Sequence, residues 1–135
     1  MRNAGTIVGC AGIMLIAAGF PLAVCAQAAD VKSEIMTAEQ HAELAAQAQT
    51  TDMVHSHLHH TLNCLVGSKS ADFDAQELNP CKNNGNGAIP DTADAATKQK
   101  LKAAVAKAKT GLAENDLATA QKIATATASI LDTAK

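Results

Sequence analysis

The chain has 135 residues, with 11 Lys and Arg against 13 Asp and Glu, and a formal net charge of −2. A nucleic-acid binder normally carries a basic surplus, so this balance argues against a nucleic-acid partner. The length supports one domain with one modest core.

Residues 1–28 have the layout of a secretory signal peptide. The basic Arg2 precedes an apolar run over residues 7–20, and small residues surround a cleavage site after Ala28. Cleavage two residues earlier is the alternative. The run is short for a membrane span, which needs ~20 residues. We therefore expect residues 29–135 to form a single periplasmic or secreted domain that has no membrane contact after cleavage.

The four cysteines divide into two groups. Cys10 and Cys25 would leave with the signal peptide, and Cys64 and Cys81 would remain. An exported pair in an oxidising compartment is most simply a disulfide. The chain contains no CxxC, so neither thioredoxin-like chemistry nor covalent c-type haem attachment is supported.

Glycine and proline separate helix-permissive stretches from one loop. After residue 28, every Gly and Pro lies between Gly67 and Pro90 or at Gly111. Residues 68–90 are rich in Asn, Asp, Gly and Pro, and we expect them to form a long loop that a Cys64–Cys81 bridge would tether.

The first helical segment is predicted to open at Thr37, where Gln40 completes a capping box, and to end at Gly67. It is either one continuous helix or two helices with a break near Thr51. Two more helices follow. The first is capped by Asp91 or Thr92 and closed by Gly111, and the second covers the C-terminal residues.

The sequence therefore predicts an all-α fold, a small up-and-down helical bundle of three or four helices with one long disulfide-tethered loop. The lysines of the predicted helix that is closed by Gly111 are expected on the solvated flank of that helix. The predicted inward-facing residues are Leu44, Ala48, Thr51, Val54, Leu58, Leu62, Leu65, Leu101, Val105, Ala108, Leu112, Leu117, Ala120, Ile123, Thr127, Ile130 and Leu131.

Residues 53–64, MVHSHLHHTLNC, hold four of the five histidines. On a helix, His55 and His59 are an i, i+4 pair whose imidazoles can converge on one ion. His57 and His60 lie together on another face, with Met53 and Cys64. We predict that His55, His57, His59 and His60 bind a transition metal, copper first and zinc second.

The remaining histidine, His41, lies fourteen residues before His55, ~21 Å along a continuous helix. It can contribute a ligand only if the chain folds back near Thr51. Because imidazoles must be neutral to ligate, we expect binding to weaken as the pH falls through ~6.5.

Two other functions remain open from the sequence, a b-type haem-binding bundle and a partner-binding helical module without metal. An enzyme is not expected. The chain has neither HExxH nor a Glu-x-x-His pair, so metalloprotease and di-iron sites are unsupported, and no turn exposes a nucleophilic serine.

The alanine-rich composition and the histidines at helical spacing resemble the small periplasmic metal-binding proteins of ammonia-oxidising and related bacteria. The resemblance implies a four-helix bundle that binds copper and other divalent ions through histidines. In that family histidines recur on several helices, whereas here the last two predicted helices contain none. The segments HHTLNCLVG, NPC and GNGAIPDT also resemble uncharacterised exported proteobacterial proteins.

Overall fold

A computed structural model describes residues 29–135, and the predicted signal peptide lies outside this range. The described residues form helices and no strands, so the all-α prediction is confirmed. The helices are α1 (Val31–Gln47), α2 (Thr51–Val66), α3 (Ala88–Asp91), α4 (Ala95–Leu112) and α5 (Leu117–Asp132). None of these helices is long and apolar enough to cross a membrane.

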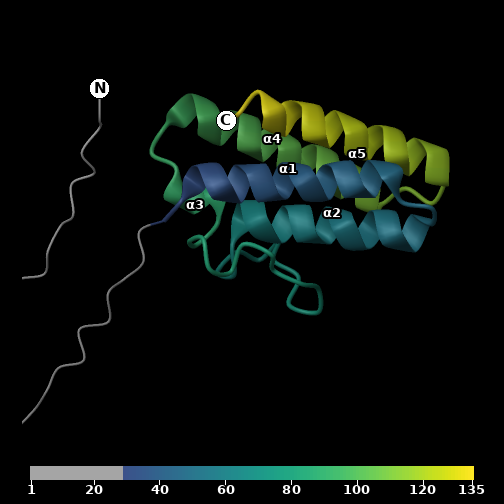
Figure 1. The fold of residues 1–135 in the computed structure, drawn as a ribbon, viewed down its shortest axis with the longest axis horizontal. Helices are drawn as coiled ribbons and strands as arrows, with labels where there is room; N and C mark the ends of the chain where they lie inside the picture. The colour runs from purple at the N-terminus through teal and green to yellow at the C-terminus, as the bar shows by residue number, and fades with distance from the viewer. Residues whose placement is uncertain (1–28) are drawn as a thin grey trace, which may run out of the picture.

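The four long helices run alternately in opposite directions along one axis (Figure 1). Helix α1 contacts α2 and α5, and α4 also contacts α2 and α5, so the four form a closed ring around the core. Short links join α1 to α2 and α4 to α5, which forces both pairs to pack antiparallel. The one-turn α3 lies at the end of the loop and was not predicted.

Polar caps begin all four long helices. The side chains of Asp30, Thr50, Asp94 and Asp116 accept hydrogen bonds from backbone N–H groups of the first turns. The predicted start at Thr37 is therefore wrong, because α1 already begins after Asp30 and runs through the expected capping box. The predicted start of α4 is also wrong, since residue 91 ends α3.

Two glycines lie at positions where separate segments of the chain come into close contact. Gly67 ends α2 as predicted, with a φ of 71°. A Cβ there would lie 1.5 Å from the carbonyl oxygen of Asn86, so only glycine fits. Gly111 does not end its helix as predicted. It lies inside α4, and a Cβ on it would come 2.6 Å from Cδ1 of Leu58, so its small size allows α4 to approach α2.

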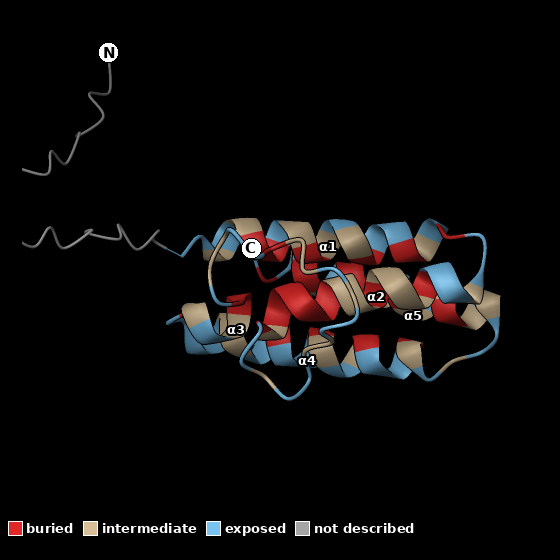
Figure 2. Cartoon of the chain, turned by 90° about the horizontal axis from the view of Figure 1, so that it is seen from below, coloured by how far each residue is buried: buried red, intermediate tan, exposed pale blue. Residues whose placement is uncertain are grey.

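The buried face of each long helix points toward the bundle axis (Figure 2). Most predicted inward residues are buried or partly buried, but Leu44 is 40% exposed. The prediction for Leu44 is wrong because the inner face of α1 is built from Ile35, Ala38, Ala42 and Ala45. Small alanines on this face let α1 lie close to its neighbours.

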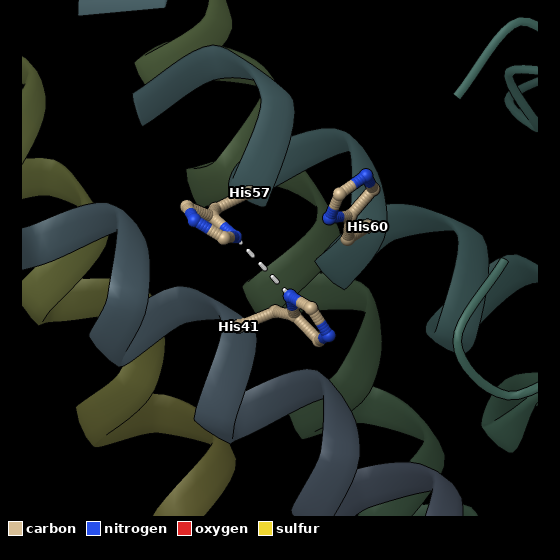
Figure 3. Close-up of side chains that lie close together, drawn as sticks. All are labelled: His41, His57 and His60. Carbon is tan, nitrogen blue, oxygen red and sulfur yellow. Dashed lines mark hydrogen bonds between the residues drawn. The ribbon is translucent and has the colours of Figure 1, made fainter. Parts of the chain in front are cut away.

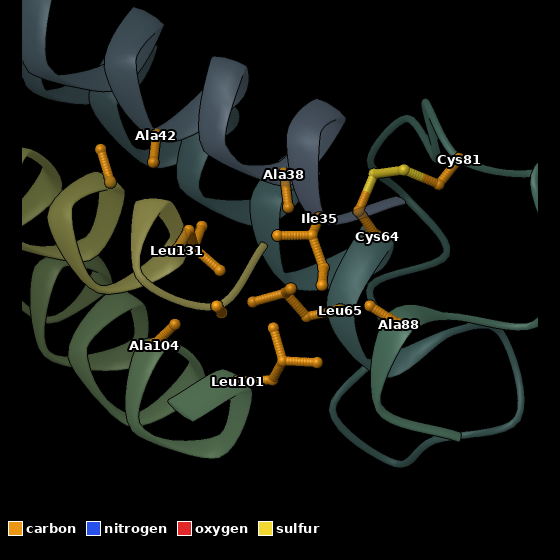
Figure 4. Packing of buried hydrophobic residues seen from close by; sticks show 12 residues of the cluster. Ile35, Ala38, Ala42, Cys64, Leu65, Cys81, Ala88, Leu101, Ala104 and Leu131 are labelled. Atoms are coloured by element: carbon orange, nitrogen blue, oxygen red, sulfur yellow. A yellow bond between two sulfur atoms is a disulfide. The ribbon is translucent and has the colours of Figure 1, made fainter. Parts of the chain in front are cut away.

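Cys64 and Cys81 form the predicted disulfide, with Cα atoms 5.1 Å apart. Figure 4 shows the bridge at the edge of the core, beside Ile35 and above Leu65. Both cysteines are almost completely buried. The bridge therefore fastens the middle of the loop that follows α2 onto the C-terminal end of that helix.

Candidate metal centre

Three histidines from two helices come together on one side of the bundle. Helix α1 supplies His41, and α2 supplies His57 and His60. One ring nitrogen from each lies within 4.8 Å of the others, and Nδ1 of His41 is 3.3 Å from Nδ1 of His57. Figure 3 shows the three rings turned toward one another across the gap between the helices. The group can hold a metal ion.

The turn between α1 and α2 produces this arrangement. Because the chain reverses at residues 48–50, His41 comes opposite the middle of α2. The buried hydroxyl of Thr61 then lies 3.1 Å from the backbone carbonyl oxygens of both Ala38 and His57. This contact ties the two helices together beside the three rings and fixes their relative height.

Partial burial keeps His41 neutral. Desolvation, followed by the neighbouring His60 and His57, lowers the pKa of His41 to about 4. At neutral pH the ring therefore carries no charge and offers a lone pair. A neutral imidazole is the form that ligates a metal, and it loses no side-chain charge on doing so.

The two ring nitrogens of His60 have different surroundings. Nε2 lies 3.3 Å from Oε2 of Glu77, whereas Nδ1 is buried and has no hydrogen-bond partner among residues 29–135. Burial lowers the pKa of His60, and the Glu77 carboxylate opposes this shift. A buried polar atom without a partner costs free energy, so the fold keeps Nδ1 of His60 free at a cost.

The structure places the predicted pair His55 and His59 elsewhere. Nε2 of His55 lies 2.8 Å from the carbonyl oxygen of Glu114, in the link between α4 and α5. Nδ1 of His59 lies 3.3 Å from Oδ2 of Asp74, in the loop after α2. Neither histidine belongs to the three-residue group found in the described part of the chain.

The structure thus brings together two of the four predicted ligands, His57 and His60, and adds His41. Sequence spacing placed His57 and His60 on one helical face, and it allowed His41 to join if the chain folded back. The carboxylate of Glu77 was not anticipated, because a residue in the long loop between α2 and α3 gives no periodic signal. Met53, which shares that face of α2, is 48% exposed at the start of the helix.

Comparisons with protein-family models, with curated proteins and with solved structures give no match to this chain.

Proposed function

We propose that this protein is an exported, non-catalytic carrier or buffer of a divalent transition metal, bound through His41, His57 and His60. The observation that carries the proposal is the group of three imidazoles, with one ring nitrogen of each within 4.8 Å of the others, in which Nδ1 of His60 is buried and has no partner among residues 29–135. A bound ion would satisfy this atom, which otherwise remains a desolvated acceptor. The disulfide and the signal-like N-terminus support an oxidising compartment.

The spacing of the rings suits a first-row metal. Two nitrogens that each lie ~2.05 Å from one ion at the tetrahedral angle are ~3.3 Å apart. The Nδ1 atoms of His41 and His57 already have this separation. The third ring has to move little, because all three ligand atoms lie within 4.8 Å of one another.

Copper is the first choice and zinc the second. Imidazole nitrogen suits both ions, and for a given set of nitrogen ligands the order of affinity places Cu²⁺ above Zn²⁺. Three protein ligands leave at least one position for water or for a ligand from another molecule. Such an incomplete shell favours moderate affinity and exchange, as a carrier or buffer requires.

The haem alternative is less favoured by the geometry. A bis-histidine haem needs the macrocycle to lie between two axial imidazoles. Here the rings of His41 and His57 face each other directly through their Nδ1 atoms, and the three ring centroids lie 5.0–5.6 Å apart. No space between these rings would admit a porphyrin.

Calorimetric titration of tag-free protein with Cu²⁺ and with Zn²⁺ tests the proposal. We expect one ion per chain, tighter binding of copper, and a loss of affinity of at least about tenfold in His41→Ala, since one of three ligands is removed. The matched control is His55→Ala/His59→Ala, which removes two histidines of the same stretch outside the group and should bind like the wild type.

Three results would contradict this assignment. Binding of neither metal at micromolar strength would reject the metal function. Loss of binding in His55→Ala/His59→Ala, with His41→Ala unaffected, would move the site to the other face of α2. A Soret band on addition of haem, without metal binding, would favour the haem alternative.

A further inference from the structure

The loop after α2 is held against the helix by Asn63. This buried side chain donates through Nδ2 to the carbonyl oxygens of Asp74 and Leu78, at 2.9 and 3.1 Å, and its Oδ1 accepts from the N–H of Asp74 at 2.9 Å. The next residue, Cys64, carries the disulfide to Cys81. Residues 74–81 are therefore anchored at both ends, beside the face of α2 that bears His60.

This anchoring places Glu77 over His60. Its Oε2 accepts a hydrogen bond from the hydroxyl of Ser56 at 3.1 Å and lies 3.3 Å from Nε2 of His60. Ser56 and His60 are an i, i+4 pair on α2, so both partners of the carboxylate sit on one rigid helix. The side chain of His60 is 12% exposed and that of Glu77 is 32% exposed, so the contact is partly shielded from water.

An ionised carboxylate can only accept hydrogen bonds, so the proton of a neutral His60 belongs on Nε2. Nδ1 then carries the lone pair, and Nδ1 is the buried atom that has no partner among the described residues. In metal sites the second nitrogen of a ligating histidine usually donates to a carboxylate, a backbone carbonyl or water, which fixes the tautomer and raises the basicity of the ligand.

We infer that Glu77 is a positioning residue for the metal site, because it holds His60 in the tautomer that leaves Nδ1 free. This role rests on the proposed function and extends it to the loop after α2. Asn63 and the disulfide anchor that loop so that the carboxylate of Glu77 lies beside His60. The negative charge of Glu77 also lies close to a site whose three ligands are imidazoles, which add no charge of their own when they ligate, and there it would offset part of the charge of a divalent ion.

The experiment combines a tautomer readout with metal titration. In long-range ¹H–¹⁵N spectra of the metal-free protein at neutral pH, His60 should carry its proton on Nε2. Glu77→Ala should release this preference and lower metal affinity by about 10- to 100-fold. Glu77→Gln should rescue the tautomer and much of the affinity, since an amide oxygen also accepts from Nε2–H.

Asp74→Asn is the matched control, because Asp74 lies in the same loop and pairs with His59, outside the three-histidine group. It should leave both the His60 tautomer and the affinity unchanged. Far-UV circular dichroism checks that each variant folds, and the contacts of Asn63 and the disulfide do not involve the side chain of Glu77.

The outcomes are distinguishable. If His60 carries its proton on Nδ1 in the wild type, or if Glu77→Ala changes neither the tautomer nor the affinity, the inference is overturned. If the wild type binds neither metal, the proposed function fails, and the tautomer spectra then decide separately whether Glu77 fixes His60. Equal losses in Glu77→Ala and Asp74→Asn would show a general effect of the loop and would also overturn the inference.

Discussion

The Nδ1 atoms of His41 and His57 lie 3.3 Å apart across the α1–α2 interface, although sixteen residues separate the two histidines in the chain. Each belongs to a different helix, so an ion bound to both would connect α1 to α2. The unfolded chain does not hold these rings together. The proposed metal binding should therefore be coupled to folding.

The first prediction follows from this coupling. A ligand that binds only the folded state adds about 2.7 kcal/mol to the free energy of unfolding at a free concentration about 100 times its Kd. For a domain of this size we expect Cu²⁺ or Zn²⁺ to raise the Tm by roughly 10 °C. Thermal melts with and without metal measure the shift.

At the same metal concentration the shift should fall to about half or less in His41→Ala, because a loss of affinity of about tenfold lowers the stabilisation to about 1.4 kcal/mol, and it should be retained in His55→Ala. A metal-induced shift of undiminished size in His41→Ala would show that the ion does not connect the two helices through this residue. Melts in the presence of a chelator give the metal-free reference for each variant.

Helical spacing predicts only the part of the site that lies on a single helix. His57 and His60 share a face of α2 because they are three residues apart, so their proximity is a local property of one helix. The approach of His41 depends on the turn at residues 48–50, which the sequence left as one of two possibilities. The position of Glu77 depends on Asn63 and on a bridge between distant cysteines, and a pattern within one segment cannot place it.

The fold was easier to predict than its boundaries. The spacing of Val54, Leu58, Leu62 and Leu65 marks an apolar stripe, and all four are buried. The helix starts were misplaced because several Asp and Thr residues near each boundary can serve as caps, and sequence alone does not rank them. The predicted helix end at Gly111 was wrong for a related reason. The missing side chain at Gly111 leaves room for Leu58, and the glycine does not end the helix.

The second prediction concerns the core. Leu62 is 3% exposed and lies in a buried cluster with Leu58 and Ala108. Leu62→Ala should lower the free energy of unfolding by ~2–5 kcal/mol, because it removes buried methyl groups and leaves a cavity. Lys102 is exposed on α4, and Lys102→Ala should change stability by less than ~0.5 kcal/mol. Urea denaturation followed by circular dichroism measures both, and equal effects would show that the assigned helix faces are wrong.

The third prediction concerns the disulfide. Cys64 and Cys81 are separated by 17 residues, and opening a closed loop of this size should cost about 3 kcal/mol on the chain-entropy model. We expect Cys64→Ser/Cys81→Ser to unfold at lower urea concentration while keeping its helical circular dichroism, because the bridge joins α2 to the loop and not to another long helix.

Reductant supplies the control for the disulfide. It should destabilise the wild type to a similar extent and leave Cys64→Ser/Cys81→Ser unchanged. An intact mass that shows free thiols at both positions in the non-reduced protein would contradict the bridge itself. Proteolysis within residues 68–87 should become faster on reduction, since the bridge then no longer fastens the middle of the loop to α2.

The fourth prediction is a pH dependence of stability that arises from Glu34. This side chain on α1 is fully buried, its Oε1 accepts a hydrogen bond from the N–H of Gly87 at 2.9 Å, and its Oε2 is buried without a partner among the described residues. Burial raises the pKa of Glu34 to about 7, the hydrogen bond from Gly87 opposes the rise, and the charges of Asp91 and Asp30 add to it.

The raised pKa of Glu34 determines whether the free energy of unfolding rises or falls with pH. In the unfolded chain the pKa of Glu34 is 4.5, so the folded state holds this proton more tightly. The stabilisation is fully present below pH 4.5 and is lost as the pH rises through about 7. A difference of this size corresponds to a change on the order of 3 kcal/mol across the window. Urea midpoints measured from pH 4.5 to 8 should show this decline.

Two variants separate ionisation from packing. Glu34→Gln keeps an acceptor for the N–H of Gly87 but cannot ionise, so its stability relative to the wild type should increase as the pH rises from 4.5 to 8. Glu34→Ala also cannot ionise, so it should gain on the wild type over the same window. Because it loses the hydrogen bond and leaves a cavity, it should be less stable than Glu34→Gln at every pH. A constant difference between Glu34→Gln and the wild type across the window would show that Glu34 does not titrate there and would contradict the prediction.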